Sequence, residues 1–226
     1  GETIDYDQYA EQVKKLIDKH VVGIEVKEPD GVYEVGKMGK IAQPEDWSEE
    51  KTRNETDIIK TRVTKMIEQQ LRDDPYAQEA FSKLLRQVIE EAEKEFDHPL
   101  KQHMLFREFE EQVEARRLDE IPDVFSGNKH AQAYYGVFKK LLPEAFSITN
   151  QQNQDKWIEL AFEVDRSVMS SVAENSINPR NIEAEKSKKL LPQMFRECKS
   201  IGSGMDQAKK IVEMIVQITR VGLNGL

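Results

Sequence analysis

The most strongly amphipathic stretch of the chain lies near its end, between Gly204 and Leu223. Apolar residues recur there at the three- and four-residue spacing of one helix face. This central stripe comprises Ala208, Ile211, Val212, Ile215 and Ile218. Met214 and Val221 widen it on one flank and Val216 on the other. We expect a terminal helix whose central stripe faces the core of this chain and whose flanking residues must also be covered.

The same spacing predicts helices through most of the remaining chain. Asp74 is placed to cap a helix that begins at Pro75, and Asn54 or Thr56 can cap the helix before it. The predicted helices cover residues 5–20, 54–72, 75–96, a stretch from Pro99, 131–142, a long stretch around 157–172, and 182–198 with an interruption at Pro192. The pattern therefore predicts a mainly α protein, a multi-helix array resembling a bundle.

The N-terminal part of the chain has a different pattern. Apolar and other residues alternate on both sides of Pro29-Asp30-Gly31, which predicts a small β-hairpin over residues 21–35. Residues 36–51 have the composition of a linker, and Trp47 is placed to pin that linker to the helical body. Because residues 146–153 are rich in Gln and Asn and uncharged, we expect three regions, 1–51, 52–146 and 147–226.

Charge narrows the possible partners. The 226-residue chain has a formal net charge of -9, so its surface repels polyanions on average, and contact with nucleic acid requires a local basic patch. The best such patch comprises Lys186, Lys188, Lys189, Arg196 and Lys199. Glu183, Glu185 and Glu197 dilute it. A solvated helix face is the default interpretation, and contact with phosphate or with an acidic partner is the alternative.

Residue types that carry chemistry do not form a recognisable site. The histidines form no His-x-x-x-His pair, and no Gly-x-Ser-x-Gly elbow is present, so we predict neither a metal site nor a catalytic nucleophile. The sole cysteine, Cys198, indicates a reducing compartment and is interpreted as a small residue near a helix end. No signal pattern or membrane-spanning run occurs, so we expect a cytoplasmic protein without membrane contact, and its abrupt start suggests a piece of a longer one.

A glycine-containing turn precedes the terminal helix. Exposed amides at a helix start can hold a phosphate, and the candidates for that role are Gly202, Ser203, Gly204, Lys209, Lys210 and Arg220. The turn lacks the Gly-Lys-Ser/Thr ending of a phosphate-binding loop, and Asp206 places a negative charge in the first turn. A flexible connector is therefore the favoured interpretation, and a nucleotide- or DNA-phosphate site is the alternative.

Four segments carry a resemblance to a known family. The segments span residues 55–68, 74–81, 128–136 and 217–223. On the basis of these segments, the chain resembles the C-terminal region of the restriction (HsdR) subunit of type I restriction-modification enzymes. The resemblance covers most of the chain. These segments are family markers and contain no catalytic signature.

The resemblance implies a parent subunit with a nuclease domain and two motor domains, which hydrolyses ATP with Mg²⁺, translocates duplex DNA and cleaves it. The nuclease and motor motifs are absent from this chain, so we expect it to lack both activities and to need no cofactor itself. The resemblance further implies a role in docking the motor subunit onto the methyltransferase and specificity subunits. The flanking residues Met214, Val216 and Val221 of the terminal helix are then covered either by other helices of this chain or by a partner subunit, which makes them candidates for partner binding. A regulatory domain that binds ATP or a DNA phosphate is the alternative.

Overall fold

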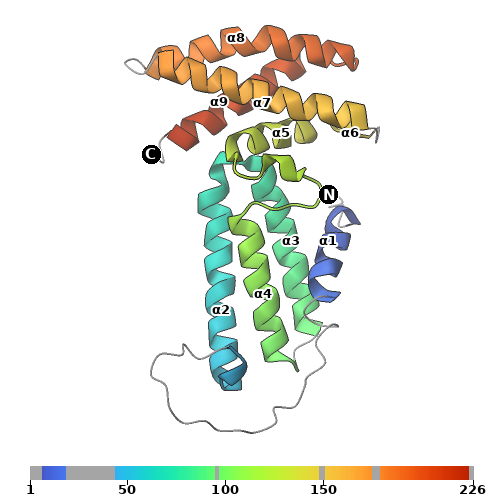
Figure 1. Ribbon diagram of the computed structural model, residues 1–226, viewed down its shortest axis with the longest axis vertical. Coiled ribbons are helices and arrows are strands. Elements are labelled where there is room, and N and C mark those ends of the chain that lie inside the picture. The colour runs from blue at the N-terminus through green and yellow to red at the C-terminus, as the bar shows by residue number, and fades with distance from the viewer. Residues whose placement is uncertain (1–6, 19–43, 95–96, 148–150, 175–178, 224–226) are drawn as a thin grey trace. The chain divides into compact units, whose positions relative to one another are not determined.

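The computed structural model describes residues 7–18, 44–94, 97–147, 151–174 and 179–223, and within these ranges every regular element is helical (Figure 1). The α-helices are α1 (Asp7–Ile17), α2 (Glu49–Lys65), α3 (Pro75–Lys94), α4 (Pro99–Glu114), α5 (Lys129–Leu141), α6 (Pro143–Phe146), α7 (Gln151–Glu174), α8 (Pro179–Ser200) and α9 (Met205–Leu223). Short helical turns are η2 (Pro44–Asp46), η3 (Met66–Gln70), η4 (Leu71–Asp73) and η5 (Asp123–Phe125). The mainly α prediction is confirmed. The hairpin predicted over residues 21–35 lies outside the described residues.

Local capping signals explain several helix starts. The Asp74 carboxylate accepts a hydrogen bond from the Ala77 amide at 3.0 Å, and the Asn128 side chain accepts one from Ala131 at 2.9 Å. Pro75, Pro99 and Pro179 each occupy the first position of a helix. Proline suits that position because the missing N–H has no helical partner there. The predicted starts at Pro75 and Pro99 are confirmed.

The start predicted at Asn54 or Thr56 is wrong, because α2 begins at Glu49. The Ser48 hydroxyl accepts a hydrogen bond from the Lys51 amide at 3.3 Å. Glu49 and Glu50 follow in the first turn, where negative charge stabilises a helix. The acidic stretch interpreted as linker is therefore partly a helix N-terminus.

The chain forms two compact units. The first contains residues 1–67 and 80–118, and the second contains residues 68–79 and 119–226. The division thus falls within α3, between Glu79 and Ala80. It differs from the three regions expected from composition, because tertiary packing groups residues 68–79 with a part of the chain that begins 40 residues later, at Asp119.

The first unit is organised along α4. Helix α4 packs against α2 and α1, and the ring of Phe81 on α3 meets that of Phe109 on α4 edge to face, with centroids 6.1 Å apart. At the surface, the guanidinium of Arg62 on α2 binds both carboxylate oxygens of Glu110 on α4, and the second of these bonds is 2.7 Å long. Glu90 and Glu93 on the outer side of α3 are exposed.

The second unit is layered. Helix α5 packs against α7 and α9, and α8 packs on the other side of those two helices (Figure 1). Residues 131–138 of α5 are buried without interruption, which identifies this helix as the centre of the unit. Helix α8 forms the outer layer.

The interruption predicted at Pro192 is wrong, because α8 is one helix from Pro179 to Ser200. Proline in a helix removes the N–H that would donate to the carbonyl four residues earlier, here that of Lys188. Both Pro192 and Lys188 are exposed, so water can reach this part of the helix. The lost bond therefore costs less than it would in a core.

Candidate docking surface

The central stripe of α9 faces the core of the second unit, as its spacing predicts. Its members are at most 4% exposed: Ala208, Ile211, Val212, Ile215 and Ile218. Met214 and Val216 on the flanks are half-buried, and the side chain of Val221 lies outside the described residues. The prediction that the stripe is buried is confirmed.

The turn before α9 is a helix cap. The Gly202 amide donates to the Lys199 carbonyl at 3.2 Å, and the Ser203 amide donates to the Cys198 carbonyl at 2.8 Å. Gly202 has a φ of +81°, which glycine adopts without steric cost. This pair of bonds and a left-handed glycine form a Schellman motif that closes α8. Two of the amides considered for a phosphate are therefore occupied by carbonyls of α8.

The cationic candidates near this turn stay on the surface. Lys209, Lys210 and Arg220 are exposed on α9, and so is Gly204 before it, while Ser203 is half-buried. Asp206 and Glu213 are exposed on the same helix, so its outer side carries both signs of charge.

Lys186 does not belong to the exposed basic surface of α8, contrary to its place in the predicted basic patch. Lys186 is only 2% exposed. It begins a buried stripe with a four-residue period that continues through Leu190, Met194 and Cys198. That period places Lys186 on the same helix face as three apolar residues, and the packing of α8 against α7 and α9 turns this face inward.

The other cations of the predicted patch share the outward face of α8. Lys188, Lys189, Arg196 and Lys199 are all exposed. At about 3.6 residues per turn, they fall within roughly 100° of the helix circumference. Among the described side chains of α8, residues 186–200, this face carries no carboxylate. The outward face of α8, defined by these residues, is thus locally basic on a chain of net charge -9.

Two carboxylates have polar partners where α8 meets α7: Glu197 of α8 and Glu163 of α7. Glu197 lies 2.7 Å from the Lys156 amine of α7 and 3.5 Å from Arg196. The Gln193 side chain donates to the Glu163 carboxylate of α7 at 2.8 Å. These contacts hold α8 in one orientation on α7, and they leave the Arg196 side chain 74% exposed.

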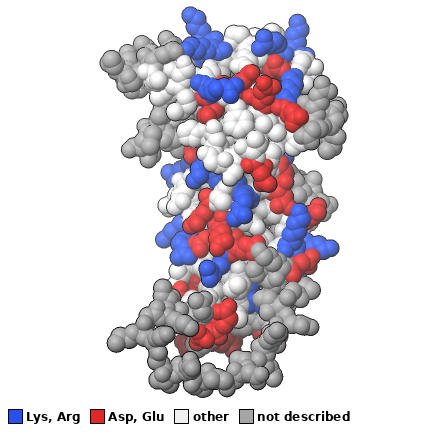
Figure 2. Space-filling model, viewed as in Figure 1, with Lys and Arg blue, Asp and Glu red and all other residues white. Residues whose placement is uncertain are grey.

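Figure 2 shows the resulting distribution of charge. Blue groups line the upper edge of this view, where α8 runs in Figure 1, and red groups lie below them. Sequence reasoning missed the apolar side chains that accompany the cations. Leu191 and Phe195 are half-buried, and Pro192 is exposed. Since they lie three or four residues from Lys188 and Lys199, they border the basic face.

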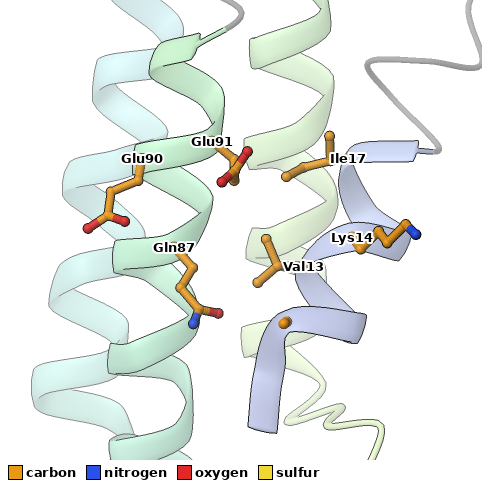
Figure 3. A pocket seen from close by; sticks show the side chains of 7 residues that line it. Val13, Lys14, Ile17, Gln87, Glu90 and Glu91 are labelled. Carbon is orange, nitrogen blue, oxygen red and sulfur yellow. The ribbon is translucent and has the colours of Figure 1, made fainter. Parts of the chain in front are cut away.

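A groove of about 390 Å³ lies in the first unit, between α1 and α3. Its lining residues are Ala10, Val13, Lys14, Ile17, Gln87, Glu90 and Glu91. Figure 3 shows Val13 and Ile17 pointing from α1 toward Glu91 on α3. Glu91 also pairs with Lys94 of its own helix. One cation, Lys14, and two carboxylates, Glu90 and Glu91, border the groove, so its charge selects no particular class of ligand.

His103 is buried in the first unit. Trp47 packs its ring on that of His103, which confirms that Trp47 pins its segment to the helical body. The Thr56 hydroxyl donates to the Thr52 carbonyl at 2.7 Å. The Thr56 hydroxyl oxygen also lies 3.3 Å from His103 Nδ1. Because its proton is already donated to Thr52, the ring nitrogen is the donor in this second bond. Burial, followed by the charge of Arg107, lowers the pKa of His103.

Cys198 is buried, as expected of a small residue near a helix end. Burial, together with the charge of Glu197, raises the pKa of its thiol. A thiol held in its neutral form is a poor nucleophile.

Residues from three of the four segments that carry the family resemblance, 74–81, 128–136 and 217–223, meet in the core of the second unit. The Tyr134 hydroxyl lies 3.3 Å from Thr219 Oγ1, and Thr219 donates its own proton to the Ile215 carbonyl at 2.9 Å. Tyr134 is therefore the donor, and burial raises its pKa to about 12. A Cβ added to Gly136 would lie 2.6 Å from that of Tyr76. These residues maintain close packing.

Within the described ranges, no group of three or more His, Cys, Asp or Glu side chains could hold a metal ion. In the same part of the chain, none of the helices combines the length and the apolar character that a membrane crossing requires. Comparison of the sequence with protein-family models and curated proteins, and with solved structures, finds no match.

Proposed function

We propose that this chain is a non-catalytic assembly module, the C-terminal region of the restriction subunit of a type I restriction-modification enzyme. In this role it docks the motor and nuclease subunit onto the methyltransferase and specificity subunits. The proposal combines the sequence resemblance with one structural observation. The outward face of α8 is basic, whereas the chain as a whole is acidic.

A local reversal of charge suits a docking surface. Complementary charge steers association and selects among partners more than it adds affinity. Because α8 is the outer layer of its unit, a partner reaches the cations without displacing another described helix. The chain needs no cofactor for this role. ATP, Mg²⁺ and duplex DNA belong to the parent enzyme.

The test mixes this chain with the purified complex of methyltransferase and specificity subunits. We expect the two to co-elute from a sizing column, and we expect the chain to compete with the full-length restriction subunit for that complex. If the chain neither binds the complex nor competes for it, the assembly function is wrong.

The alternative is a regulatory domain that holds a nucleotide or a DNA phosphate at the turn from Gly202 to Gly204. The turn's geometry weighs against this alternative, because the amides of Gly202 and Ser203 bond to carbonyls of α8. Calorimetric titration with ATP and with short duplex DNA separates the two functions. A docking module should give no heat with ATP, and saturable heat would support the alternative.

A further inference from the structure

We infer that the outward face of α8 binds an acidic amphipathic helix of a protein partner. This inference rests on the proposed docking function and names the chemistry that the docking surface recognises.

The arrangement of charge sets the length of the partner segment. Lys188 and Lys199 are eleven residues apart, which corresponds to roughly 16 Å along a helix. Arg196 lies between them on the same face. A partner helix of about three turns spans this distance and can place carboxylates at three- or four-residue spacing opposite the cations.

The apolar border distinguishes a protein partner from a nucleic acid. Leu191 and Phe195 lie on one side of the cations, Pro192 lies among them, and none of the three is fully buried within this chain. An amphipathic helix covers such a border with its own apolar face, as in other helix-mediated interfaces. A phosphodiester backbone offers charge along its length but no apolar side chain to this border.

The surface is also formed before the partner binds. Helix α8 packs against both α7 and α9, and it is tied to α7 through Gln193 and Glu197. At its end, the Gly202 cap closes the helix. A partner therefore meets cations on a helix that is already formed, which reduces the entropy that binding must overcome.

The experiment compares two double charge reversals in the whole 226-residue chain. Lys188→Glu with Arg196→Glu changes the outward face of α8. Lys209→Glu with Lys210→Glu makes the same charge change on α9 and is the matched control. Circular dichroism and a urea melt establish that both variants fold. Affinity for the methyltransferase and specificity complex is then measured by calorimetry at low and moderate salt.

We expect the α8 reversal to weaken binding at least about tenfold, and the α9 reversal to change it less than about threefold. Raising the salt should weaken the wild-type complex and should affect the α8 variant less. Equal affinities for the wild type and the α8 variant, or equal losses for both variants, would overturn the inference while leaving the assembly function intact.

A second arm tests the partner chemistry without the parent enzyme. One probe is a synthetic helix with glutamates on one face and leucines on the other. The second probe is a scrambled peptide of the same composition, and the third is a short DNA duplex. We expect the amphipathic helix to bind wild type at least about tenfold more tightly than the scrambled peptide, with Phe195→Ala removing most of the difference.

Tighter binding of duplex DNA than of the amphipathic helix would overturn the inference in favour of a phosphate-binding surface. Equal binding of the two peptides would overturn it by showing that charge alone is recognised. If the chain fails to bind the subunit complex but selects the amphipathic helix, the assembly function is wrong and the inferred chemistry of α8 stands.

Discussion

The rings of Trp47 and His103 pack edge to face, with centroids 5.2 Å apart and planes inclined by 66°. Trp47 follows the short turn η2, and His103 lies on α4, so the contact joins residues far apart in the chain. It gives the segment before α2 a fixed place on the first unit.

Replacing Trp47 by alanine should lower the free energy of unfolding by about 1–2 kcal/mol. This is less than the ~3–5 kcal/mol typical of fully buried aromatic residues, because Trp47 is half-buried. Urea unfolding monitored by circular dichroism measures the change. Trp47→Phe keeps a ring against His103 and should cost less than alanine. An unchanged midpoint for Trp47→Ala would show that the contact contributes nothing.

The buried His103 should make the protein less stable in mild acid. Its pKa is lowered from 6.5 first by burial and then by Arg107, while Glu55 and Glu45 act in the opposite direction. The unfolded chain therefore binds the proton more readily than the folded chain does. The free energy of unfolding is highest above pH ~6.5 and falls as the pH drops below that value.

Urea melts between pH 7.5 and 5, compared with those of His103→Gln, test this effect. Glutamine can still donate a hydrogen bond toward Thr56 but cannot titrate, so its decline in stability over this range should be shallower. Parallel curves for the two proteins would assign the decline to other groups.

Gly136→Ala should destabilise the second unit by about 1–3 kcal/mol. The added Cβ would lie 2.6 Å from the Tyr76 Cβ, which belongs to the base of a side chain and cannot swing away. Thermal or urea unfolding measures the loss. Gly204→Ala is the control, since nothing lies within 4 Å of its added Cβ, and it should cost under about 1 kcal/mol. Equal losses would mean that the close approach to Tyr76 is not the cause.

Gly202→Ala should lower stability by about 1 kcal/mol, because alanine adopts the left-handed conformation of the α8 cap only at a cost. Asparagine tolerates this conformation better, so Gly202→Asn should lose less. Both are measured by urea unfolding. If Gly202→Ala were as stable as the wild type, the cap would not require a glycine.

Many of the helices could be predicted from short stretches of the sequence. Pro75 and Pro99 begin helices and Asn128 caps one, because capping depends on a few consecutive residues. The misplaced start of α2 had a local signal as well, Ser48 followed by two glutamates. Pro192 could not be interpreted in the same way. Whether a helix continues through a proline depends on packing and on whether the affected carbonyl is solvated.

Helices α9 and α8 illustrate what the sequence alone determined and what required the tertiary structure. The three- and four-residue spacing of apolar residues determined that α9 is a helix and that Ile211 and Ile215 face inward, because burial of an apolar stripe follows from helical geometry. Only the tertiary structure decided that Lys186 is buried while Arg196 is exposed. Both belong to one basic run, and neighbouring helices determine which side of α8 faces water.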